Sequence, residues 1–483
     1  MRVSISFPPL ESGKGVPLLA QNRQFQWFNS PTYIYPMIPA SAATLLKRGG
    51  HDVIWDDGIA EGIGYSTWLE RLIGAEPDIV AIETKTPVVK RHWRIINQIK
   101  ERNPKIRVVL MGDHVTALPE ESMKNSLADF VITGGDFDFS LAGVCDFVSG
   151  KGKLPLGVWY RKPPGIRNTG RFRLDHDLDS LPFIDRDLTK WKLYSEKNGN
   201  YKRLPGTYTM AGRDCWYHKC TFCSWTTMFP SFRTRGPENL LEEIGMLIDR
   251  YGVREIMDDT GTLPVGPWLE KFCRGMIDNS YNKEVIMDCN MRFGALSLEQ
   301  YRLMKRAGFR LLLFGLESGE QKSLDRVNKS LKVEQITKSC RNAKKAGLEP
   351  HITIMFGYPW EGKREAMKTL ELGRYLLRKG YADTVQATLV IPYPGTPLFE
   401  ECRKKGLLKT LDWERYDMRE TVMKTPISEE EIQGMVQSIY RVAFHPEFVA
   451  RKVAGIRSRD DIRFMKRAGK KVLGHIRDFS GRG

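Results

Sequence analysis

The chain has 483 residues, of which 41% are hydrophobic and 28% charged, a composition typical of a globular protein with a sizeable core. No apolar run approaches the roughly 18 residues that a membrane helix needs, and the first residues lack the pattern of a signal peptide. We therefore expect a cytoplasmic protein without a membrane span. The net charge of +17 favours an acidic or phosphate-bearing partner. The sequence contains no RNA-binding signature, so nucleic acid is disfavoured as that partner.

Residues 1–148 alternate short apolar runs with helical patterns. The strands are expected at 2–7, 51–57, 78–84, 106–114 and 128–136. Strands that alternate with helices predict an α/β fold with a doubly wound, Rossmann-like parallel sheet, whose ligands bind beyond the carboxyl ends of the strands. The loops at those ends are rich in Gly, Thr and Asp. No G-x-G-x-x-G follows the first strand, so a dinucleotide is disfavoured.

Turn-forming residues dominate 149–205, which predicts a linker. A second series of strands and helices begins at residue 206. Its six strands are expected at 206–212, 253–259, 284–292, 309–318, 349–357 and 384–395. Six such units predict a partial or full α/β barrel over residues 206–400, and residues 401–483 have a mainly helical pattern.

The loop after the first barrel strand contains three cysteines within nine positions, Cys215, Cys220 and Cys223. In a reducing compartment, cysteines so close together indicate metal or redox chemistry. A structural zinc site needs four ligands and no second pair follows at finger spacing, although a catalytic zinc site with three ligands stays open. A cubane iron–sulfur cluster held by three thiolates keeps one iron open for a substrate. The other five cysteines are scattered and are expected to be inert core residues: Cys145, Cys273, Cys289, Cys340 and Cys402.

The chain resembles radical S-adenosylmethionine (SAM) enzymes that carry an N-terminal cobalamin-binding domain. The usual cysteine spacing of that family is C-x3-C-x2-C with an aromatic residue before the last cysteine. Phe222 matches the aromatic residue, but the first gap here is one residue longer. Residues 258–262, 314–329, 357–361 and 392–407 resemble later strand ends of the family, and the resemblance extends through the first domain and the linker.

The resemblance implies that the three cysteines hold a 4Fe–4S cluster whose open iron binds SAM. Phe222 is then expected near the adenine, and Glu317 at the ribose hydroxyls or the amino group. A buried carboxylate such as Glu317 is costly unless it is paired, which favours a functional role. Asp259, Thr260 and Arg292 are further strand-end candidates, the last for the methionyl carboxylate, although a surface salt bridge is an equal alternative.

The resemblance also implies cobalamin in the first domain. No D-x-H-x-x-G sequence is present, so no histidine is expected on the cobalt. The alternative is a sheet that kept its shape and lost its ligand. The aromatic segment 25–36 is expected over the corrin or at the substrate entry, or as a hydrophobic wedge between the domains. The expected cobalamin contacts are Thr84, Thr86, Gly112, His114, Thr116, Gly134 and Gly135.

By resemblance, the leading activity is anaerobic C-methylation of an unactivated carbon through a 5′-deoxyadenosyl radical and methylcobalamin. An electron donor such as ferredoxin or flavodoxin is then expected. The alternative is an oxidative cyclase or other ring-forming enzyme with the same cofactors, and a non-catalytic carrier is a third, weaker reading. The substrate expected first is a peptide or protein side chain, such as a glutamine of methyl-coenzyme M reductase. Other family members act on antibiotic precursors, phosphonates or lipids.

We predict that anaerobically reconstituted protein binds about four irons per chain, as one cubane cluster requires. Replacement of Cys215, Cys220 and Cys223 by alanine is expected to abolish the iron-dependent absorption, because no thiolate ligand is then left in the loop. Iron analysis and absorption spectroscopy measure both. Tight zinc without iron-dependent absorption would contradict the prediction.

Overall fold

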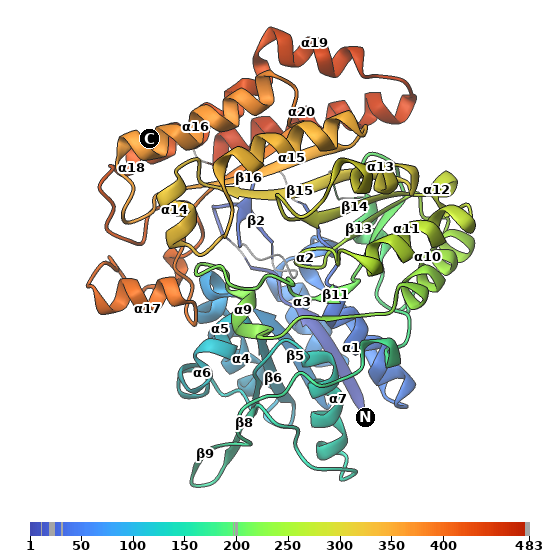
Figure 1. The fold of residues 1–483 in the computed structure, drawn as a ribbon. Helices are drawn as coiled ribbons and strands as arrows, with labels where there is room; N and C mark the ends of the chain where they lie inside the picture. Colours follow the sequence, from blue (N-terminus) through green and yellow to red (C-terminus); the bar gives the residue numbers. More distant parts are fainter. Residues whose placement is uncertain (11, 19–24, 30–31, 197, 199–200, 479–483) are drawn as a thin grey trace.

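The computed structural model describes residues 1–10, 12–18, 25–29, 32–196, 198 and 201–478. It has the mixed α/β fold that the sequence predicts. The first sheet lies at the bottom of Figure 1, the second lies above it, and the helices of the C-terminal region cover the top. The two sheets are separate, so each builds its own layered unit.

Five parallel strands form the first sheet in the order β4-β1-β5-β6-β7. Strand β5 is buried along its whole length, and β1 and β6 are buried after their first residue. Such strands need cover on both faces. Helix α1 packs against α7, whereas α3 and α6 pack against α4, and these two groups supply the cover. The bounds are β1 Arg2–Phe7, α1 Met37–Arg48, β4 Asp52–Asp57, α3 Tyr65–Gly74, β5 Ile79–Thr84, α4 Val89–Arg102, β6 Arg107–Gly112, α6 Pro119–Asn125, β7 Phe130–Ile132 and α7 Phe137–Val148.

The structure differs from the sequence prediction at two places in this unit. Strands β8 (Val158–Lys162) and β9 (Gly165–Asn168), within the expected linker, extend the first sheet as an antiparallel hairpin next to β7. Strand β6 ends at Gly112, and the two residues expected to continue it begin helix α5 (Asp113–Ala117). Gly112 has a φ of 129°, a conformation that glycine adopts readily and that turns the chain out of the strand.

Six parallel strands form the second sheet in the order β10-β13-β14-β15-β16-β17. In the described residues β10 does not pair with β17, so the sheet is a partial barrel with an open seam. Alternate residues of β15 and β16 are only half-buried, because they face a central cavity. The bounds are β10 Gly206–Thr209, α10 Pro237–Tyr251, β13 Glu255–Asp258, α11 Pro267–Asp278, β14 Ile286–Met291, α13 Leu298–Arg306, β15 Phe309–Glu317, α15 Val333–Lys345, β16 Glu349–Phe356, α16 Lys363–Arg378 and β17 Thr384–Leu389.

The C-terminal region closes the open seam. Helix α18 (Glu429–Tyr440) packs on β17, and α20 (Arg459–Asp478) packs on α18. On the other side of the seam, Asp461 at the start of α20 pairs with Lys202 (Oδ1 to Nζ, 2.8 Å), just before β10. Further along α20, the Arg467 guanidinium donates to the backbone oxygen of Tyr201 (2.8 Å). Helix α20 therefore spans the gap between the first and last strands.

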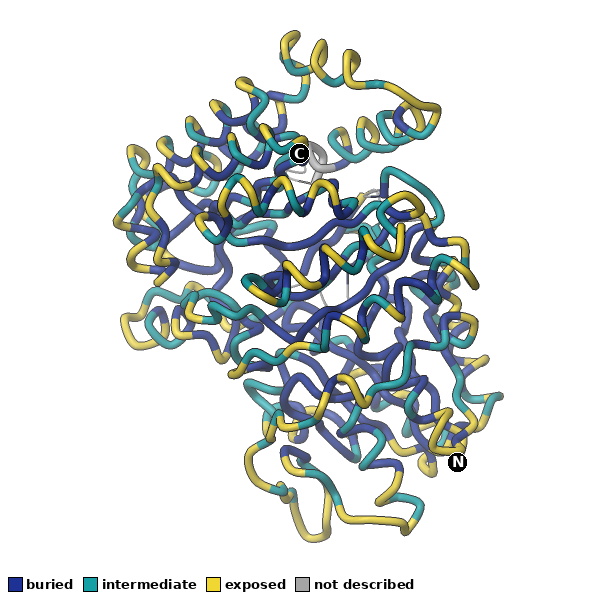
Figure 2. Tube along the Cα trace, turned by 45° about the vertical axis from the view of Figure 1, so that its right-hand side comes forward, coloured by how far each residue is buried: buried dark blue, intermediate teal, exposed yellow. Residues whose placement is uncertain are grey.

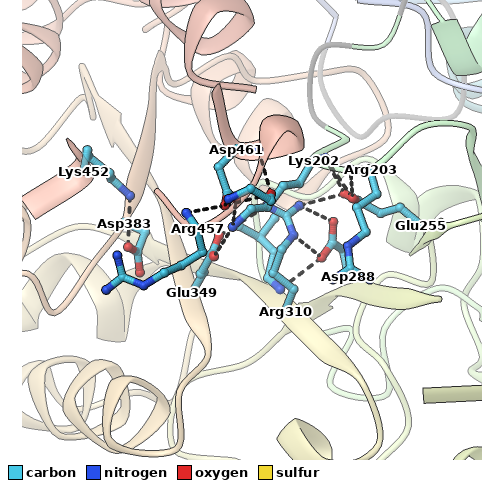
Figure 3. Close-up of polar contacts among 12 residues, drawn as sticks. Lys202, Arg203, Glu255, Asp288, Arg310, Glu349, Asp383, Lys452, Arg457 and Asp461 are labelled. Atoms are coloured by element: carbon cyan, nitrogen blue, oxygen red, sulfur yellow. Dashed lines mark hydrogen bonds and ion pairs between the residues drawn. The ribbon is translucent and has the colours of Figure 1, made fainter. Parts of the chain in front are cut away.

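A buried guanidinium ties together the starts of four neighbouring barrel strands (Figure 3). Arg310 on β15 donates from Nη2 to Asp288 Oδ2 (2.5 Å) on β14 and to Glu255 Oε1 (2.9 Å) on β13. Its Nη1 donates to Glu349 Oε2 (3.2 Å) on β16. Burial raises the pKa of Glu255, and the charge of Arg310 opposes that rise. The guanidinium therefore compensates carboxylates that could not otherwise be buried.

We predict that Arg310→Met lowers the free energy of unfolding by about 3–5 kcal/mol, because it leaves the Asp288 and Glu255 carboxylates buried without their cation. Urea unfolding measures the change. The matched control is Arg302→Met on α13, where the half-exposed side chain pairs only with neighbouring Glu299. It should change stability by about 0.5 kcal/mol at most. Equal losses in the two variants would show that the buried network contributes no more than a surface pair.

Candidate functional site

The cysteine loop starts at the carboxyl end of β10. It is held by two side chains at the carboxyl end of the neighbouring strand β13 and just beyond it. Asp258 Oδ2 accepts from the backbone N–H of Ala211 (2.8 Å), and Thr260 Oγ1 accepts from that of Gly212 (2.9 Å). Thr260 is fully buried and does not line the cavity, so it supports the loop. Beyond it, Cys215 Sγ lies 3.0 Å from Thr262 Oγ1.

Cys215, Cys220 and Cys223 line the same cavity. The N–H of Cys223 donates to the backbone oxygen of Cys220 (3.3 Å), which places both in one turn. Among the described residues, no three His, Cys, Asp or Glu side chains converge as a mononuclear metal site requires. A cubane cluster takes one thiolate per iron, so its cysteines surround a volume and do not meet at a point. This donor set fits a 4Fe–4S cluster better than zinc.

A buried ion pair lies beside these thiols. Glu317 ends β15 with a φ of 64°, and the pairing of β15 with β16 shifts register at this residue. Its Oε1 accepts from Lys329 Nζ (2.7 Å), and both side chains line the cavity. Burial lowers the pKa of Lys329, but the charges of Glu317 and the Cys220 thiol outweigh burial and leave this pKa above its ordinary value. The cavity therefore presents a charged pair next to a cysteine.

Arg292 holds the segment that carries this lysine. Its Nη2 donates to the backbone oxygens of Lys329 and Ser330, the latter at 3.0 Å. The guanidinium lies 3.7 Å from the ring centroid of Tyr217, a residue of the cysteine loop. Arg292 also lines the cavity, so the surface salt bridge considered for it is not what the structure shows. Contact with a SAM carboxylate stays a prediction.

The cavity has a volume of about 650 Å³ and runs along the inside of the partial barrel. Phe222 and Asp259 line it, and Lys329 Nζ lies 6.0 Å from the centroid of the Phe222 ring; their contact with SAM stays a prediction. Phe28 and Ile34 from the aromatic segment line it too; residues 30 and 31 of that segment lie outside the described residues. A cavity of this size accommodates a small-molecule cofactor or substrate.

The cysteine loop is bound to the first domain through Arg213, a buried residue two positions before Cys215. Its guanidinium donates to Asp136 Oδ1 (2.7 Å) and to Asp138 Oδ2 (2.5 Å), which follow β7. His176 and Arg233 also contact Asp136. Burial raises the pKa of Asp136, but His176 and the two arginines outweigh burial and hold this pKa well below its ordinary value.

The threonines and the histidine expected to contact cobalamin lie at the carboxyl ends of β5 and β6, as predicted. There they bond to protein groups: Thr84 Oγ1 lies 2.7 Å from His92 Nδ1, and Thr86 Oγ1 lies 3.2 Å from His114 Nδ1. The His114 ring is fully buried, 5.3 Å from the ring of Trp413 in the C-terminal region. These contacts make His114 part of the packing between the domains.

The predicted glycines are also used for close packing. A Cβ at Gly112 would lie 2.2 Å from the Thr84 oxygen. A Cβ at Gly135 would lie 2.0 Å from the ring of Phe229, which follows the cysteine loop. Phe172 crowds Gly134 in the same way, and Thr116 Oγ1 accepts from the N–H of Gly134 (3.1 Å). None of the seven predicted cobalamin contacts lines the barrel cavity.

Two polar side chains at this sheet edge have buried atoms without a hydrogen-bond partner among the described residues. Both carboxylate oxygens of Glu83, at the end of β5, are in this state, as is Nε2 of His92. Burial raises the pKa of Glu83 to about 7; the charge of Lys85 opposes this rise, and the weaker effect of the Asp113 charge adds to it. Buried polar atoms in proteins normally have hydrogen-bond partners. The unpartnered atoms of Glu83 and His92 lie at the edge where such sheets bind ligands, so they are suited to hydrogen bonds with a polar ligand such as the side groups of cobalamin.

Sequence reasoning missed Lys329, Tyr217, Thr262 and Glu83. Lys329 ends the 314–329 segment that was singled out, and Tyr217 is within the cysteine loop, but nothing in the pattern distinguished either from a surface residue. Glu83 carried a usable signal, since a carboxylate next to the end of a strand that is otherwise apolar up to that point is unusual.

Residues 211–373 match the Radical SAM superfamily, so the chain contains a radical SAM domain, which implies a 4Fe–4S cluster and SAM. The chain is 27% identical over 401 residues to an uncharacterized methyltransferase of Pyrococcus horikoshii, covering 82% of this chain and 84% of that protein. It is 26% identical over 421 residues to the anaerobic magnesium-protoporphyrin IX monomethyl ester cyclase of Rubrivivax gelatinosus, covering 85% of this chain and 73% of that enzyme.

Two solved structures share the fold over nearly the whole chain. The cobalamin-dependent SAM radical enzyme OxsB matches with a TM-score of 0.70 at 14% identity, covering 98% of this chain and 71% of OxsB. The radical SAM methyltransferase TsrM of Kitasatospora setae matches with a TM-score of 0.68 at 13% identity, covering 97% of this chain and 99% of TsrM. The expectation of a cobalamin-type fold followed by a radical SAM domain is therefore confirmed.

We predict that Glu83→Gln stabilises the protein at pH 8 and not at pH 4.5. The Glu83 pKa lies near 7 in the folded state against 4.5 ordinarily. The Glu83 carboxyl therefore does not reduce the free energy of unfolding below pH 4.5. As the pH rises from 4.5 to 7 that free energy falls, and above pH 7 it is lower by about 3 kcal/mol. Glutamine removes that loss. Urea unfolding at the two pH values measures the gain.

Glu101→Gln, an exposed change on α4, is the control and should behave alike at both pH values. A Glu83→Gln effect that is the same at pH 4.5 and pH 8 would show that this carboxyl does not hold a proton in the folded state at intermediate pH.

Proposed function

We propose that this radical SAM protein is a cobalamin-dependent methyltransferase that adds a methyl group to an unactivated carbon of its substrate. The observation that carries the proposal is that one cavity of the barrel is lined by three thiols and by the Glu317–Lys329 pair. The doubly wound first sheet is a separate sheet of the same chain. The similarity in fold to OxsB and TsrM over nearly the whole chain, and in sequence to a methyltransferase, supports both the cofactor and the reaction.

The protein's own groups bind and orient. Cys215, Cys220 and Cys223 would hold the cluster, and the bound groups would supply one-electron cleavage of SAM and methyl carriage. Lys329 can donate to a carboxylate, and Glu317 can accept from an amine or a hydroxyl, the two functions that SAM presents. Both side chains are buried, so they act where water is scarce and their hydrogen bonds are stronger than they would be at the surface.

The residues that would hold cobalamin are those at the carboxyl ends of the first sheet. Among the described residues, Glu83 and His92 have buried atoms without a hydrogen-bond partner, and Thr84 bonds to the other ring nitrogen of His92. No D-x-H-x-x-G sequence is present, so we propose that no histidine binds the cobalt. His114 fits that proposal, because both of its ring nitrogens already face protein groups, Thr86 and Glu121.

A second candidate is an anaerobic oxidative cyclase. It is favoured by similarity to the Rubrivivax gelatinosus cyclase over 85% of this chain. The radical SAM domain serves both reactions, so the products discriminate between them. A one-electron donor is required in either case, and ferredoxin or flavodoxin are the proposed sources.

The substrate stays a proposal. A glutamine of methyl-coenzyme M reductase, or another protein side chain, is tested by none of the comparisons. The cavity away from the thiols is lined by apolar side chains of the C-terminal region, including Phe444, Phe464 and Val472. This lining favours a molecule with a large apolar part over a polar peptide segment.

We predict that the reconstituted enzyme, supplied with substrate and reductant, forms 5′-deoxyadenosine and S-adenosylhomocysteine in near-equal amounts and a product heavier by one methyl group. Positioning the reacting carbon within one cavity makes methyl transfer faster than escape of the radical. Liquid chromatography with mass spectrometry measures all three. Cys220→Ala should abolish all product formation, whereas Cys402→Ala, a buried cysteine outside the cavity, should keep it.

A product that has lost hydrogens and gained no carbon, with 5′-deoxyadenosine but no S-adenosylhomocysteine, would assign the enzyme to the cyclase class. If the Cys220→Ala variant were as active as the unmodified chain, the reaction would not depend on a cluster held by Cys220.

A further inference from the structure

The C-terminal region exposes apolar side chains that the core does not use. Of the ten large hydrophobic side chains that the described residues leave exposed, five lie between residues 444 and 473. We call these five the C-terminal patch: Phe444 (55% exposed), Val449 (43%), Val453 (55%), Ile462 (46%) and Leu473 (51%). Single exposed apolar residues are ordinary, but such a concentration in one short region marks an interaction surface.

Helical spacing places these side chains in stripes. Val449 and Val453 are one turn apart on α19 (Pro446–Ala454). Ile462 and Leu473 are about three turns apart on α20 and so lie on one side of it. Helices α19 and α20 follow one another at the end of the molecule opposite the first sheet (Figure 1), where Figure 2 shows exposed positions recurring along the tube.

Basic side chains flank the stripe on α20. Arg459, Arg463, Lys466 and Lys470 are exposed and follow one another at spacings of four, three and four residues, which places them on one face. Residues 441–483 hold twelve Lys and Arg against four Asp and Glu, a surplus of eight in a chain whose whole surplus is 17. Nearly half of the excess positive charge therefore lies in the last tenth of the sequence.

The barrel cavity reaches the surface within this patch. Phe444 and Leu473 are each more than half exposed, and both also line the cavity. Phe448, Phe464 and Met465 continue the apolar lining inward from α19 and α20. Apolar side chains therefore line the cavity where it reaches this end of the protein, together with the charged side chains of Asp383 and Lys452.

We propose that α19 and α20 dock this protein onto an anionic lipid surface, with the C-terminal patch in contact with the lipid and the flanking Lys and Arg on its phosphates. An amphipathic helix with apolar residues on one side and a basic polar face is the arrangement that binds a membrane interface. A nucleic acid would use the cations and leave the apolar side chains exposed, and a second copy of the chain would set equally basic faces against each other. An apolar substrate could then pass from lipid to cavity; this last point rests on the proposed function, whereas docking does not.

Co-sedimentation of the purified full chain with vesicles tests the proposal. We predict binding to vesicles of equal parts phosphatidylcholine and phosphatidylglycerol, at least tenfold weaker binding to phosphatidylcholine alone, and release at high salt, because screening weakens the attraction of cations to the lipid phosphates. Two double variants should each weaken binding several-fold: Val449→Ser with Val453→Ser, and Lys466→Glu with Lys470→Glu. Vesicle binding requires neither cluster nor turnover, so its failure is distinct from failure of the proposed function.

Matched controls come from the first domain and from the linker that follows it. Leu127→Ser removes an equally exposed apolar side chain (47%), and Lys151→Glu with Lys153→Glu reverses two exposed charges; both should bind as the unmodified chain does. Absence of binding to anionic vesicles at low salt would overturn the proposal, as would equal losses in the control variants. A dimer that the Val449→Ser, Val453→Ser variant dissociates would overturn it too, since the patch would then be a contact between copies.

Discussion

The buried Arg213 guanidinium is the interaction on which the arrangement of the two halves depends. It lies two residues before the first cysteine and binds Asp136 and Asp138, which follow the last parallel strand of the first sheet. Removal of one partner from a buried pair leaves an uncompensated charge, so the halves cannot separate here without a large cost. The cysteine loop and the carboxyl ends of the first sheet are thereby held against one another, and the two proposed cofactor sites share one junction.

The open barrel imposes the second constraint. Six strands do not close on themselves, so the seam between β10 and β17 must be covered by other chain, and α20 covers it. The two ends of the barrel strands also differ in their chemistry. Carboxylates and Arg310 at the strand starts form a compensated network, whereas the thiols and the Glu317–Lys329 pair lie beyond the carboxyl ends, where such sheets bind ligands.

The first-domain residues that the sequence suggested for a ligand also serve in packing. The predicted threonines and glycines are at the expected strand ends, yet Gly135 packs against Phe229, and Thr84, Thr86 and Thr116 contact other residues of the protein. Among the described residues at this edge, Glu83 and His92 instead have buried atoms without a hydrogen-bond partner. The residue types that signalled a ligand were found from sequence, but the groups left without partners depend on how segments distant in sequence pack over the sheet.

The sequence by itself determined the order along the chain of the parallel strands in both sheets, the cysteine loop after the first barrel strand, and Glu317 at a strand end. These follow from local periodicity and from spacing within a few residues, which any fold of the chain must respect. Only the tertiary structure decided that Lys329 pairs with Glu317, that Arg213 joins the cysteine loop to the first domain, and that α20 closes the barrel with its basic face outward. Such pairings join residues distant in the chain, and a pattern of residue types does not specify which distant partner a charged or apolar side chain meets.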